Sequence, residues 1–353
     1  MAKIRIGIIG MGAIGNIHAD AYLASADCEV VALCDVRADA LTAATEKFAV
    51  AKTYNDYREM LKMTDLDAVS VCVGNVFHKE CAVAAFNAGK HVMLEKPMAM
   101  NGAQAAEIVA AEKLSGKVGQ MGMVWRQNPQ AQVVKDYIDR GLLGEIYHMR
   151  VIYIRRRGIP GLGGWFTTKA LSGGGPIIDV GVHFFDLALY LSGLWNVSAV
   201  SAATYAKFGN PMDKYNYVDM WAGPPQYAGV CDTEDYATGT VRFGQAATMN
   251  FEIAWAANTK EQLVLELLGD KGGVRLLGDG EKLTVFTEQA DKIVDIQPLY
   301  SADSNGFHRE IQKFIDAING KCLPAATMEQ GAKLMQLLDA IYLSAECGAE
   351  VKL

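Results

Sequence analysis

Short apolar runs alternate with stretches of helical length along the first third of the chain. The apolar runs lie at Ile4–Ile9, Val30–Cys34, Ala68–Val73, His91–Glu95 and Val118–Met121. The helical patterns between them lie at Ile14–Ser25, Ala38–Phe48, Tyr57–Lys62, Lys79–Ala88 and Gly102–Leu114. Strands of continuous Val, Ile and Leu are typical of a parallel sheet that is buried on both faces. The pattern therefore predicts a doubly wound α/β domain over residues 1–124.

The pattern changes after residue 124. Strand-like runs now follow one another with short turns between them, at Ile146–Arg155, Val197–Tyr205, Tyr236–Phe243, Ala246–Ala254, Gln262–Leu268, Gly273–Leu277 and Lys282–Phe286. Helices are expected at Val180–Ser192 and, closing the chain, at Phe307–Asn319 and Met328–Cys347. This density of strands predicts a second, α+β domain over residues 125–353 with a large, mostly antiparallel sheet. The closing helices could pack back on the first domain, and Lys207–Cys231 is expected to be a long functional or interface loop.

A glycine-rich hexapeptide stands directly after the first apolar run. Gly10-Met11-Gly12-Ala13-Ile14-Gly15 has the spacing G-x-G-x-x-G and opens a predicted helix. In this context Gly10 allows a tight turn, Gly12 a close backbone approach to a pyrophosphate, and Gly15 close packing of helix on strand. The start of the helix, with Ala13 and Ile14, would present N–H groups and a partial positive charge to the phosphates. The hexapeptide therefore predicts a Rossmann domain that binds a dinucleotide.

The end of the second predicted strand bears on the choice of cofactor. Asp35 stands there, twenty residues after Gly15, where an acid hydrogen-bonds the adenosine ribose hydroxyls. Its charge would repel a 2′-phosphate, which favours NAD over NADP. Arg37, two residues further on, is either a cation for such a phosphate or a solvated side chain in the first turn of a helix. We expect NAD, with NADP as the less favoured alternative.

Composition and charge exclude several classes of protein. The 353 residues are 51% apolar and 21% charged, as in soluble globular enzymes. The net charge is 33 − 40 = −7, and the longest basic block is Arg155-Arg156-Arg157, so nucleic acid is not an expected partner. No apolar run reaches the roughly 20 residues of a membrane span, and no secretory leader precedes the first strand, so no membrane partner is expected.

Cysteine and histidine spacing give no sign of a disulfide framework or of a metal site. The seven cysteines form no C-x-x-C, and several lie within apolar runs, which favours reduced thiols and a cytoplasmic protein. The six histidines show neither H-x-x-x-H nor H-E-x-x-H, so no metal is expected. Redox chemistry would then belong to an organic cofactor.

Three further segments carry a resemblance to a known family. They are Glu95-Lys96-Pro97 at the end of the fifth strand, Val71-Cys72-Val73-Gly74-Asn75-Val76-Phe77-His78, and Gly173-Gly174-Gly175-Pro176-Ile177-Ile178-Asp179-Val180-Gly181-Val182-His183. Together with the glycine fingerprint they resemble the glucose–fructose oxidoreductase/inositol dehydrogenase (Gfo/Idh/MocA) family over essentially the whole chain. One departure is Gly74, where the family commonly has Pro. The resemblance implies an NAD(P)-dependent oxidoreductase that acts on CH–OH groups, with Asn75 and His78 near the cofactor.

Oxidation of an alcohol needs a base for the hydroxyl proton and a group that stabilises the developing alkoxide. Asp179 and His183 are four residues apart, so they share one face if their segment is helical. The resemblance makes His183 the base and Lys96 the group that orients the substrate and stabilises the alkoxide. It leaves Asp179 to bind a neighbouring hydroxyl or to assist the proton relay. Glu95 either orients Lys96 or helps to seat the nicotinamide ribose.

The substrate class follows from the resemblance. We expect a sugar, a glycoside or an inositol-like polyol, with Arg126, Tyr153, Arg155 and Trp165 as candidate substrate-binding residues. Two alternatives stay open: an NAD-dependent glycoside-cleaving enzyme that works through a transient keto-sugar, and a nicotinamide-binding sensor without catalysis. Because the second sheet needs its open face covered, and because the family associates through this sheet, a homodimer or homotetramer is expected.

Overall fold

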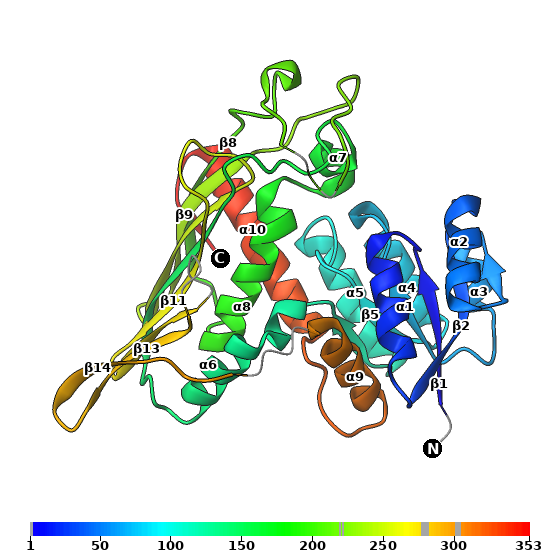
Figure 1. Cartoon of the computed structure of the whole chain (residues 1–353), viewed down its shortest axis with the longest axis horizontal. Helices are drawn as coiled ribbons and strands as arrows, with labels where there is room; N and C mark the ends of the chain where they lie inside the picture. The colour runs from blue at the N-terminus through cyan, green and yellow to red at the C-terminus, as the bar shows by residue number, and fades with distance from the viewer. Residues whose placement is uncertain (1–2, 219, 221, 277–281, 301–304) are drawn as a thin grey trace. The chain divides into compact units, whose positions relative to one another are not determined.

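The first third of the chain forms a six-stranded sheet in which all neighbouring strands are parallel, in the order β3-β2-β1-β4-β5-β6 (Figure 1). The strands are β1 (Ile4–Ile9), β2 (Cys28–Cys34), β3 (Thr53–Tyr54), β4 (Ala68–Val71), β5 (His91–Leu94) and β6 (Gly119–Met121). The computed structural model describes residues 3–218, 220, 222–276, 282–300 and 305–353. The doubly wound α/β prediction is confirmed, and the two-residue strand β3 is an addition to it.

Helices separate the strands of this sheet along the chain. They are α1 (Ala13–Leu23), α2 (Ala38–Phe48), α3 (Tyr57–Leu61), the short 3₁₀ turn η1 (Asn75–Phe77), α4 (His78–Asn87), α5 (Gly102–Ser115) and the 3₁₀ turn η2 (Val124–Gln127). A helix from near the C-terminus, α9 (Gly306–Ile318), packs beside α1 (Figure 1). Its residues Ile311, Phe314 and Ile315 lie on one helical face and enter the core that Ile6 and Ile8 of β1 form.

The chain divides into two units, which are described here separately. The first contains Met1–Gln127 and Asn305–Met335, and the second contains Asn128–Ser304 and Gln336–Leu353. The long helix α10 (Met328–Cys347) begins in the first unit and ends in the second. The boundary between residues 124 and 125 that the sequence suggests stays a prediction.

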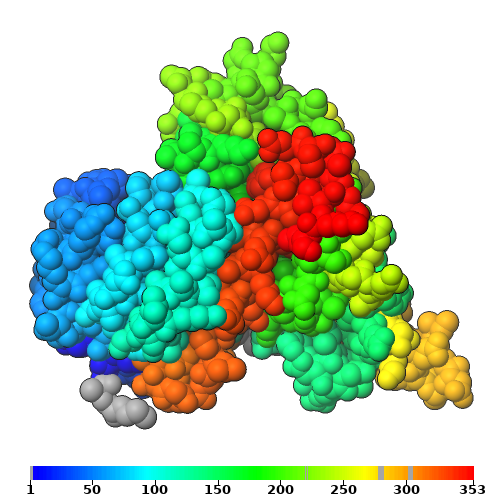
Figure 2. All heavy atoms as spheres, turned by 180° about the vertical axis from the view of Figure 1, so that it is seen from behind, coloured from blue at the N-terminus to red at the C-terminus, as the bar shows by residue number. Residues whose placement is uncertain are grey.

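The second unit is built on a nine-stranded sheet in the order β14-β13-β12-β11-β7-β10-β9-β8-β15. Only the β7–β10 pair is parallel, which confirms the prediction of a mostly antiparallel sheet. The strands are β7 (Ile146–Ile154), β8 (Ala199–Tyr205), β9 (Tyr236–Phe243), β10 (Ala247–Ala254), β11 (Gln262–Gly269), β12 (Gly272–Leu276), β13 (Thr284–Gln289), β14 (Lys292–Ile296) and β15 (Val351–Lys352). The β13–β14 hairpin projects from the rest of this unit (Figure 2). Leu277, the last residue of one expected strand, lies outside the described residues.

One face of this sheet is covered by α6 (Pro129–Asp139), the π-helical turn η4 (Ile177–Gly181) and α8 (Val182–Ser192) (Figure 1). The unit also contains the short turns η3 (Trp165–Thr167) and α7 (Lys169–Ser172) and, in a loop, the 3₁₀ turn η5 (Met212–Lys214). Helix α8 lies against β7 and β11, and α6 packs on α8. Among the described residues, only the helical stretch Lys169–Ser192 is long and apolar enough to cross a membrane, and 83% of its apolar window is buried, as in a core helix.

The opposite face of the sheet carries polar side chains, whereas the expectation of a homodimer or homotetramer assumes an open face that needs to be covered. Cross-strand hydrogen bonds join His148 to Thr248 (2.8 Å) and Thr240 to Asn250 (2.9 Å), and Arg150 pairs with Glu266 at 2.9 Å. Because side chains alternate between faces, the neighbouring residues Met149 and Val151 point into the core. Polar cross-strand pairs therefore make this exposed face compatible with water.

The long loop that the sequence suggests at Lys207–Cys231 is present in its described part. It contains η5 and otherwise only turns, and it projects from the second unit (Figure 1). The Asp235 carboxylate fixes its start, because it accepts hydrogen bonds from the backbone N–H groups of Lys207, Phe208 and Gly209. Asp219 and Trp221, within the same loop, lie outside the described residues.

Candidate active site

The glycine-rich turn connects β1 to α1 with little room on one side and open space on the other. A Cβ at Gly10, where φ is +95°, would stand 2.4 Å from the Cys72 carbonyl oxygen, and one at Gly15 would stand 1.9 Å from the Gly10 carbonyl oxygen. A Cβ at Gly12 would meet no described atom within 4 Å. Gly12 is the N-cap of α1, so the first N–H groups of the helix lie beside that space. The turn fits a pyrophosphate that approaches the backbone.

Asp35 lies directly after β2 and is tied to this turn. One carboxylate oxygen accepts a hydrogen bond from the Met11 N–H at 2.7 Å, and the other accepts one from the Arg37 N–H at 2.8 Å. The Arg37 guanidinium lies 3.6 Å from the same carboxylate and its side chain is 57% exposed. A carboxylate held in this way can still accept hydrogen bonds from ribose hydroxyls, so the residues present fit the adenosine end of NAD.

Lys96 follows β5 and is half-buried, whereas Val92–Glu95 and Pro97–Ala99 around it are buried. The Glu95 carboxylate accepts a hydrogen bond from the Lys96 backbone N–H at 3.2 Å. Its other oxygen lies 3.0 Å from Nε2 of His18 on α1. These contacts support the first of the two expected roles of Glu95, the orientation of Lys96.

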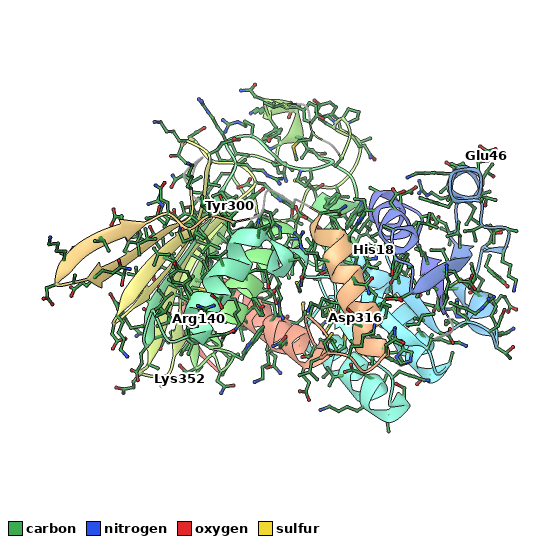
Figure 3. All side chains as sticks on the ribbon, turned by 60° about the horizontal axis from the view of Figure 1, so that its bottom comes forward. His18, Glu46, Arg140, Tyr300, Asp316 and Lys352 are labelled. Carbon is green, nitrogen blue, oxygen red and sulfur yellow. The ribbon has the colours of Figure 1, made fainter. Side chains whose placement is uncertain are left out.

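His18 is the centre of a buried polar cluster in the first unit. Its Nδ1 lies 3.1 Å from the Ser70 hydroxyl, which also bonds the Tyr22 hydroxyl at 2.8 Å. Figure 3 shows His18 of α1 beside α9, where Phe307 packs near its ring. Burial lowers the pKa of His18, but Cys72 and Glu95 beside the ring raise it well above its usual value. The His18 partner holds the pKa of Glu95 below its usual value in spite of burial. His18 and Glu95 thus form a buried ion pair.

Asn75 and His78 lie at the start of α4 and are both buried. The His78 ring nitrogens face the carbonyl oxygens of Pro97 at 2.6 Å and Val73 at 3.0 Å. Burial lowers the pKa of His78, and the two carbonyl groups oppose that effect. His78 therefore ties the loop after β4 to the loop that carries Lys96.

Asp179 and His183 lie where η4 runs into α8. From residue 174 to residue 189 these two are half-buried and all the others are buried. The shared exposure shows that both side chains reach the same uncovered face of an otherwise buried helical segment. A spacing of four places two residues on the same face of an α-helix. Asp179 and His183 share a face here although the first turn is π-helical, and such turns are frequent at functional sites.

The glycines before this segment make room for Glu234. A Cβ at Gly175 would lie 2.1 Å from the Glu234 carbonyl oxygen and 3.0 Å from its carboxyl group. The Glu234 carboxylate accepts hydrogen bonds from the N–H groups of Gly175 (3.0 Å) and Ile177 (3.3 Å) and from the Tyr342 hydroxyl (2.8 Å). Burial raises the pKa of Glu234, and these donors oppose the increase. Sequence reasoning missed Glu234, because it stands 59 residues from Gly175.

The candidate substrate residues separate into two groups. Tyr153 stacks on Phe184, the neighbour of His183, with ring centroids 5.1 Å apart, and the Arg155 Nε–H donates to the Tyr153 hydroxyl at 2.9 Å. Trp165 lies in η3 with 41% of its surface exposed. These three belong to the second unit, like Asp179 and His183.

Arg126 differs from the other three. It belongs to the first unit and only 1% of its surface is exposed. Its Nη1 donates to the Ala325 carbonyl at 2.7 Å and to the Gln330 side chain at 2.8 Å. This placement supports a structural role in anchoring the start of α10, so we leave Arg126 out of the site proposed below.

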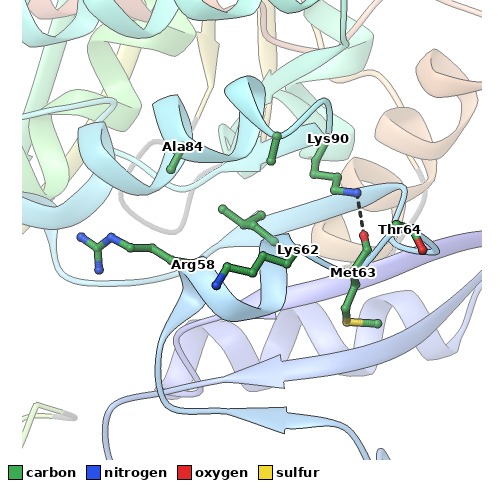
Figure 4. A pocket seen from close by; sticks show the side chains of 8 residues that line it. Arg58, Lys62, Met63, Thr64, Ala84 and Lys90 are labelled. Carbon is green, nitrogen blue, oxygen red and sulfur yellow. Dashed lines mark hydrogen bonds between the residues drawn. The ribbon is translucent and has the colours of Figure 1, made fainter.

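A separate cavity of about 450 Å³ lies on the first unit (Figure 4). Its lining contains Arg58, Leu61, Lys62, Met63, Thr64, Ala84, Ala88 and Lys90. The Lys90 ammonium group bonds the Met63 carbonyl there, at 2.8 Å. None of the candidate cofactor, catalytic or substrate residues lines this cavity. Within the described ranges no three His, Cys, Asp or Glu side chains gather as metal ligands would.

A Rossmann sheet with an open glycine turn, an acid after β2 and a strand-end lysine defines a dinucleotide-dependent oxidoreductase. Residues 4–123 match the family described as "Oxidoreductase family, NAD-binding Rossmann fold", and residues 131–275 match the "GFO/IDH/MocA C-terminal domain". The chain belongs to the Gfo/Idh/MocA family of oxidoreductases, as the sequence motifs suggested.

Named relatives agree with this class. The chain is 35% identical, over 100% of its length and 98% of the relative's, to D-glucoside 3-dehydrogenase of Escherichia coli (strain K12). It is 29% identical to myo-inositol 2-dehydrogenase of Thermotoga maritima over 99% of the chain and 98% of that protein. The solved structure of levoglucosan dehydrogenase in complex with NADH and levoglucosan has a TM-score of 0.85, at 24% identity and 99% coverage of both chains. That last likeness confirms the fold of both units.

Proposed function

We propose that this NAD-dependent dehydrogenase oxidises a secondary ring hydroxyl of a D-glucoside, at carbon 3. The observation that carries the proposal is the pair Asp179–His183 on one uncovered face, in a chain that also has Lys96 after β5. The full-length likeness to D-glucoside 3-dehydrogenase supports a glucoside in preference to an inositol. Cyclic polyols, which a 29% identical relative is named for, are the second candidate class.

The proposed roles follow from the chemistry of alcohol oxidation. The chemistry that NAD supplies when it is bound is acceptance of the hydride at its nicotinamide ring. Gly10, Gly12 and the first turn of α1 hold the pyrophosphate, and Asp35 holds the adenosine ribose. His183 takes the hydroxyl proton as general base. Lys96 stabilises the developing alkoxide, and Glu95 fixes the main chain from which it projects.

Side chains of the second unit would recognise the sugar. Asp179 would accept a hydrogen bond from a neighbouring hydroxyl or assist the proton relay from His183. Tyr153, held by Arg155 and stacked on Phe184, offers an aromatic face and a hydroxyl next to the catalytic helix. Trp165 offers a second, exposed aromatic face, which suits the C–H groups of a sugar ring.

We further propose a homodimer or homotetramer in the cytoplasm. Seven free cysteines, four of them buried, support a reducing compartment. The projecting β13–β14 hairpin, where Ile293 is 86% exposed, supports association through the second unit. Light scattering at micromolar concentration tests this, and a monomer would contradict it.

The function is tested by a matched pair of substrates. Methyl glucoside and its 3-deoxy analogue are incubated with the protein and NAD or NADP, and NADH or NADPH is followed by absorbance. We expect NADH from the parent sugar only. Reduction of the product with borodeuteride, followed by NMR, should place deuterium at carbon 3. Inositols and free hexoses are measured alongside.

Other outcomes separate the alternatives. Reduction of NAD by inositol alone would shift the proposal to the polyol class. Chromatography that shows release of the aglycone without accumulation of NADH would identify the glycoside-cleaving alternative. Tight binding of NAD with no turnover of any compound in the panel would contradict the proposed oxidation.

A further inference from the structure

Trp255 stands directly after β10 and, among the described residues, is the largest side chain that is almost completely buried, with 1% of its surface exposed. Its main chain is held on both sides. The Trp255 N–H donates to the Asp235 carbonyl at 2.9 Å, and the Trp255 carbonyl accepts from the Gly158 N–H at 2.8 Å. The sheet therefore fixes the backbone from which the indole projects, and burial restricts rotation of the ring.

The indole N–H of this residue reaches the site. Nε1 of Trp255 donates a hydrogen bond to Oδ2 of Asp179 at 3.0 Å, across 76 positions of sequence. A hydrogen bond to a charged acceptor is stronger than one between neutral groups, and it strengthens where water is excluded. The donor lies in the core, whereas the carboxylate that it holds is half-buried on the uncovered face of η4 and α8.

Two consecutive residues tie this contact to the turn that carries Asp179. The Asp235 carbonyl holds the Trp255 main chain, and the carboxylate of the preceding residue, Glu234, holds the Gly175 and Ile177 N–H groups at the start of η4. The main chains that carry the Trp255 donor and the Asp179 acceptor are thus both held by the dipeptide Glu234–Asp235. This arrangement sets their separation independently of any substrate.

We propose that Trp255 is a positioning residue of the dehydrogenase: its indole N–H fixes the orientation of the Asp179 carboxylate. The proposal rests on the proposed role of Asp179 in catalysis.

The test removes the N–H and keeps an aromatic ring. Trp255→Phe should lower kcat by roughly 10-fold or more, the usual effect of losing one hydrogen bond to a charged group. NAD affinity should stay unchanged, and KM should change less than kcat. Replacement of Trp255 by 3-benzothienylalanine, which keeps the bicyclic shape without the N–H, should give the same loss of kcat if Phe packs poorly.

A matched control separates positioning from packing. Phe251→Leu, in the same strand β10, also reduces a buried aromatic side chain, which packs on Phe185. It should lower thermal stability and leave kcat near the wild-type value. If Trp255→Phe and the benzothienyl variant keep the wild-type kcat, or lower it no more than Phe251→Leu does, the proposal is overturned.

Failure of the proposed function gives a different result. Asp179→Asn with wild-type turnover would show that Asp179 is outside the machinery, whatever Trp255 does. If Asp179→Asn is inactive and Trp255→Phe is unaffected, only the positioning role fails. In the double variant, Trp255→Phe should add little to Asp179→Asn, because residues that act through one another are not additive.

Discussion

Two buried carboxylates, one in each unit, lie directly behind the proposed catalytic residues and are stabilised in different ways. Glu95, which supports the main chain of Lys96, is paired with the His18 imidazole, and its pKa is lowered. Glu234, which supports the turn that carries Asp179, accepts hydrogen bonds from two backbone N–H groups and a tyrosine hydroxyl, and burial raises its pKa. Both are less than a tenth exposed.

The difference shows what a buried charge requires. A cation at hydrogen-bonding distance keeps Glu95 ionised, and the same contact keeps His18 protonated, so removal of one partner leaves the other charged and uncompensated. The donors to Glu234 are neutral, so the loss of one donor costs a hydrogen bond without stranding a charge. The first unit should therefore be more sensitive to substitutions behind its catalytic residue than the second.

The largest effect is expected where each unit supplies a reacting group. His183→Ala should lower turnover by roughly 10²–10⁴, the usual contribution of a general base. Lys96→Ala should also reduce turnover strongly, and in addition weaken NAD binding, because Lys96 stands at the carboxyl end of β5, the edge of the sheet where dinucleotides bind. Steady-state kinetics with the glucoside, and calorimetric titration of NAD, measure the two effects separately.

NAD affinity is the control measurement for the His183→Ala and Lys96→Ala variants. His183→Ala should keep wild-type NAD affinity and thermal stability, since His183 lies outside the glycine turn. Near-normal turnover in that variant, with folding intact, would move the base to another residue, Lys96 first.

The next effect tests the ion pair. His18→Leu removes the cation and leaves the Glu95 carboxylate buried, so the free energy of unfolding at pH 7 should fall by about 3–5 kcal/mol. His148→Leu is the matched control, because His148 lies on the partly exposed sheet face and its ring bonds the neutral Thr248 hydroxyl. It should cost about 1 kcal/mol. Equal losses in urea-induced unfolding of the two variants would contradict the idea of a stranded charge.

Local patterns were enough to predict the elements and the motifs. Strand β1 and helix α2 have the predicted bounds, and the glycine turn, Asp35 and Lys96 follow strands that apolar runs reveal. The face shared by Asp179 and His183 also follows from a spacing of four. The supports could not be predicted, because their partners are distant in sequence: Trp255 stands 76 residues from Asp179 and His18 stands 77 from Glu95.

Three of the described strands were missed for another reason. Strands β3, β14 and β15 are short, and β3 and β15 have only two residues each, so none of the three shows a periodic pattern. The polar cross-strand pairs on the open sheet face were missed because alternation shows which residues are exposed and not what they pair with. Arg126 was predicted as a substrate-binding residue, and local spacing could not show its contacts with Ala325 and Gln330, which stand about two hundred residues away.

A third buried carboxyl sharpens the comparison within the first unit. Glu310 on α9 is 1% exposed, and burial, together with the nearby charge of Glu95, raises its pKa well above the usual value. The folded state therefore binds a proton that the unfolded state releases near pH 4.5. The stability that Glu310 contributes is fully present below that pH and falls as pH rises toward the folded-state pKa.

Glu310→Gln should remove this penalty. The variant should be about as stable as wild type at pH 4 and more stable at neutral pH, by about 1.4 kcal/mol for each pH unit between the unfolded-state pKa and the lower of the assay pH and the folded-state pKa. Urea-induced unfolding at several pH values measures the difference. A variant that loses stability progressively as pH rises would show that Glu310 is ionised and serves as a counter-charge.

The smallest effect is expected for the hydrogen bonds to Glu234, which supports the turn that carries Asp179. Tyr342→Phe removes one of the neutral donors to Glu234 and leaves the backbone N–H groups of Gly175 and Ile177 in place. Because no charge is stranded, the free energy of unfolding should fall by about 1 kcal/mol, well below the loss in His18→Leu. The pKa of Glu234 should rise further, so the loss should grow with pH through the range in which wild-type Glu234 is ionised. Turnover should change little, since Trp255 still holds the Asp179 carboxylate. A loss as large as that of His18→Leu would show that neutral donors and a cation are equally critical to a buried carboxylate in this protein.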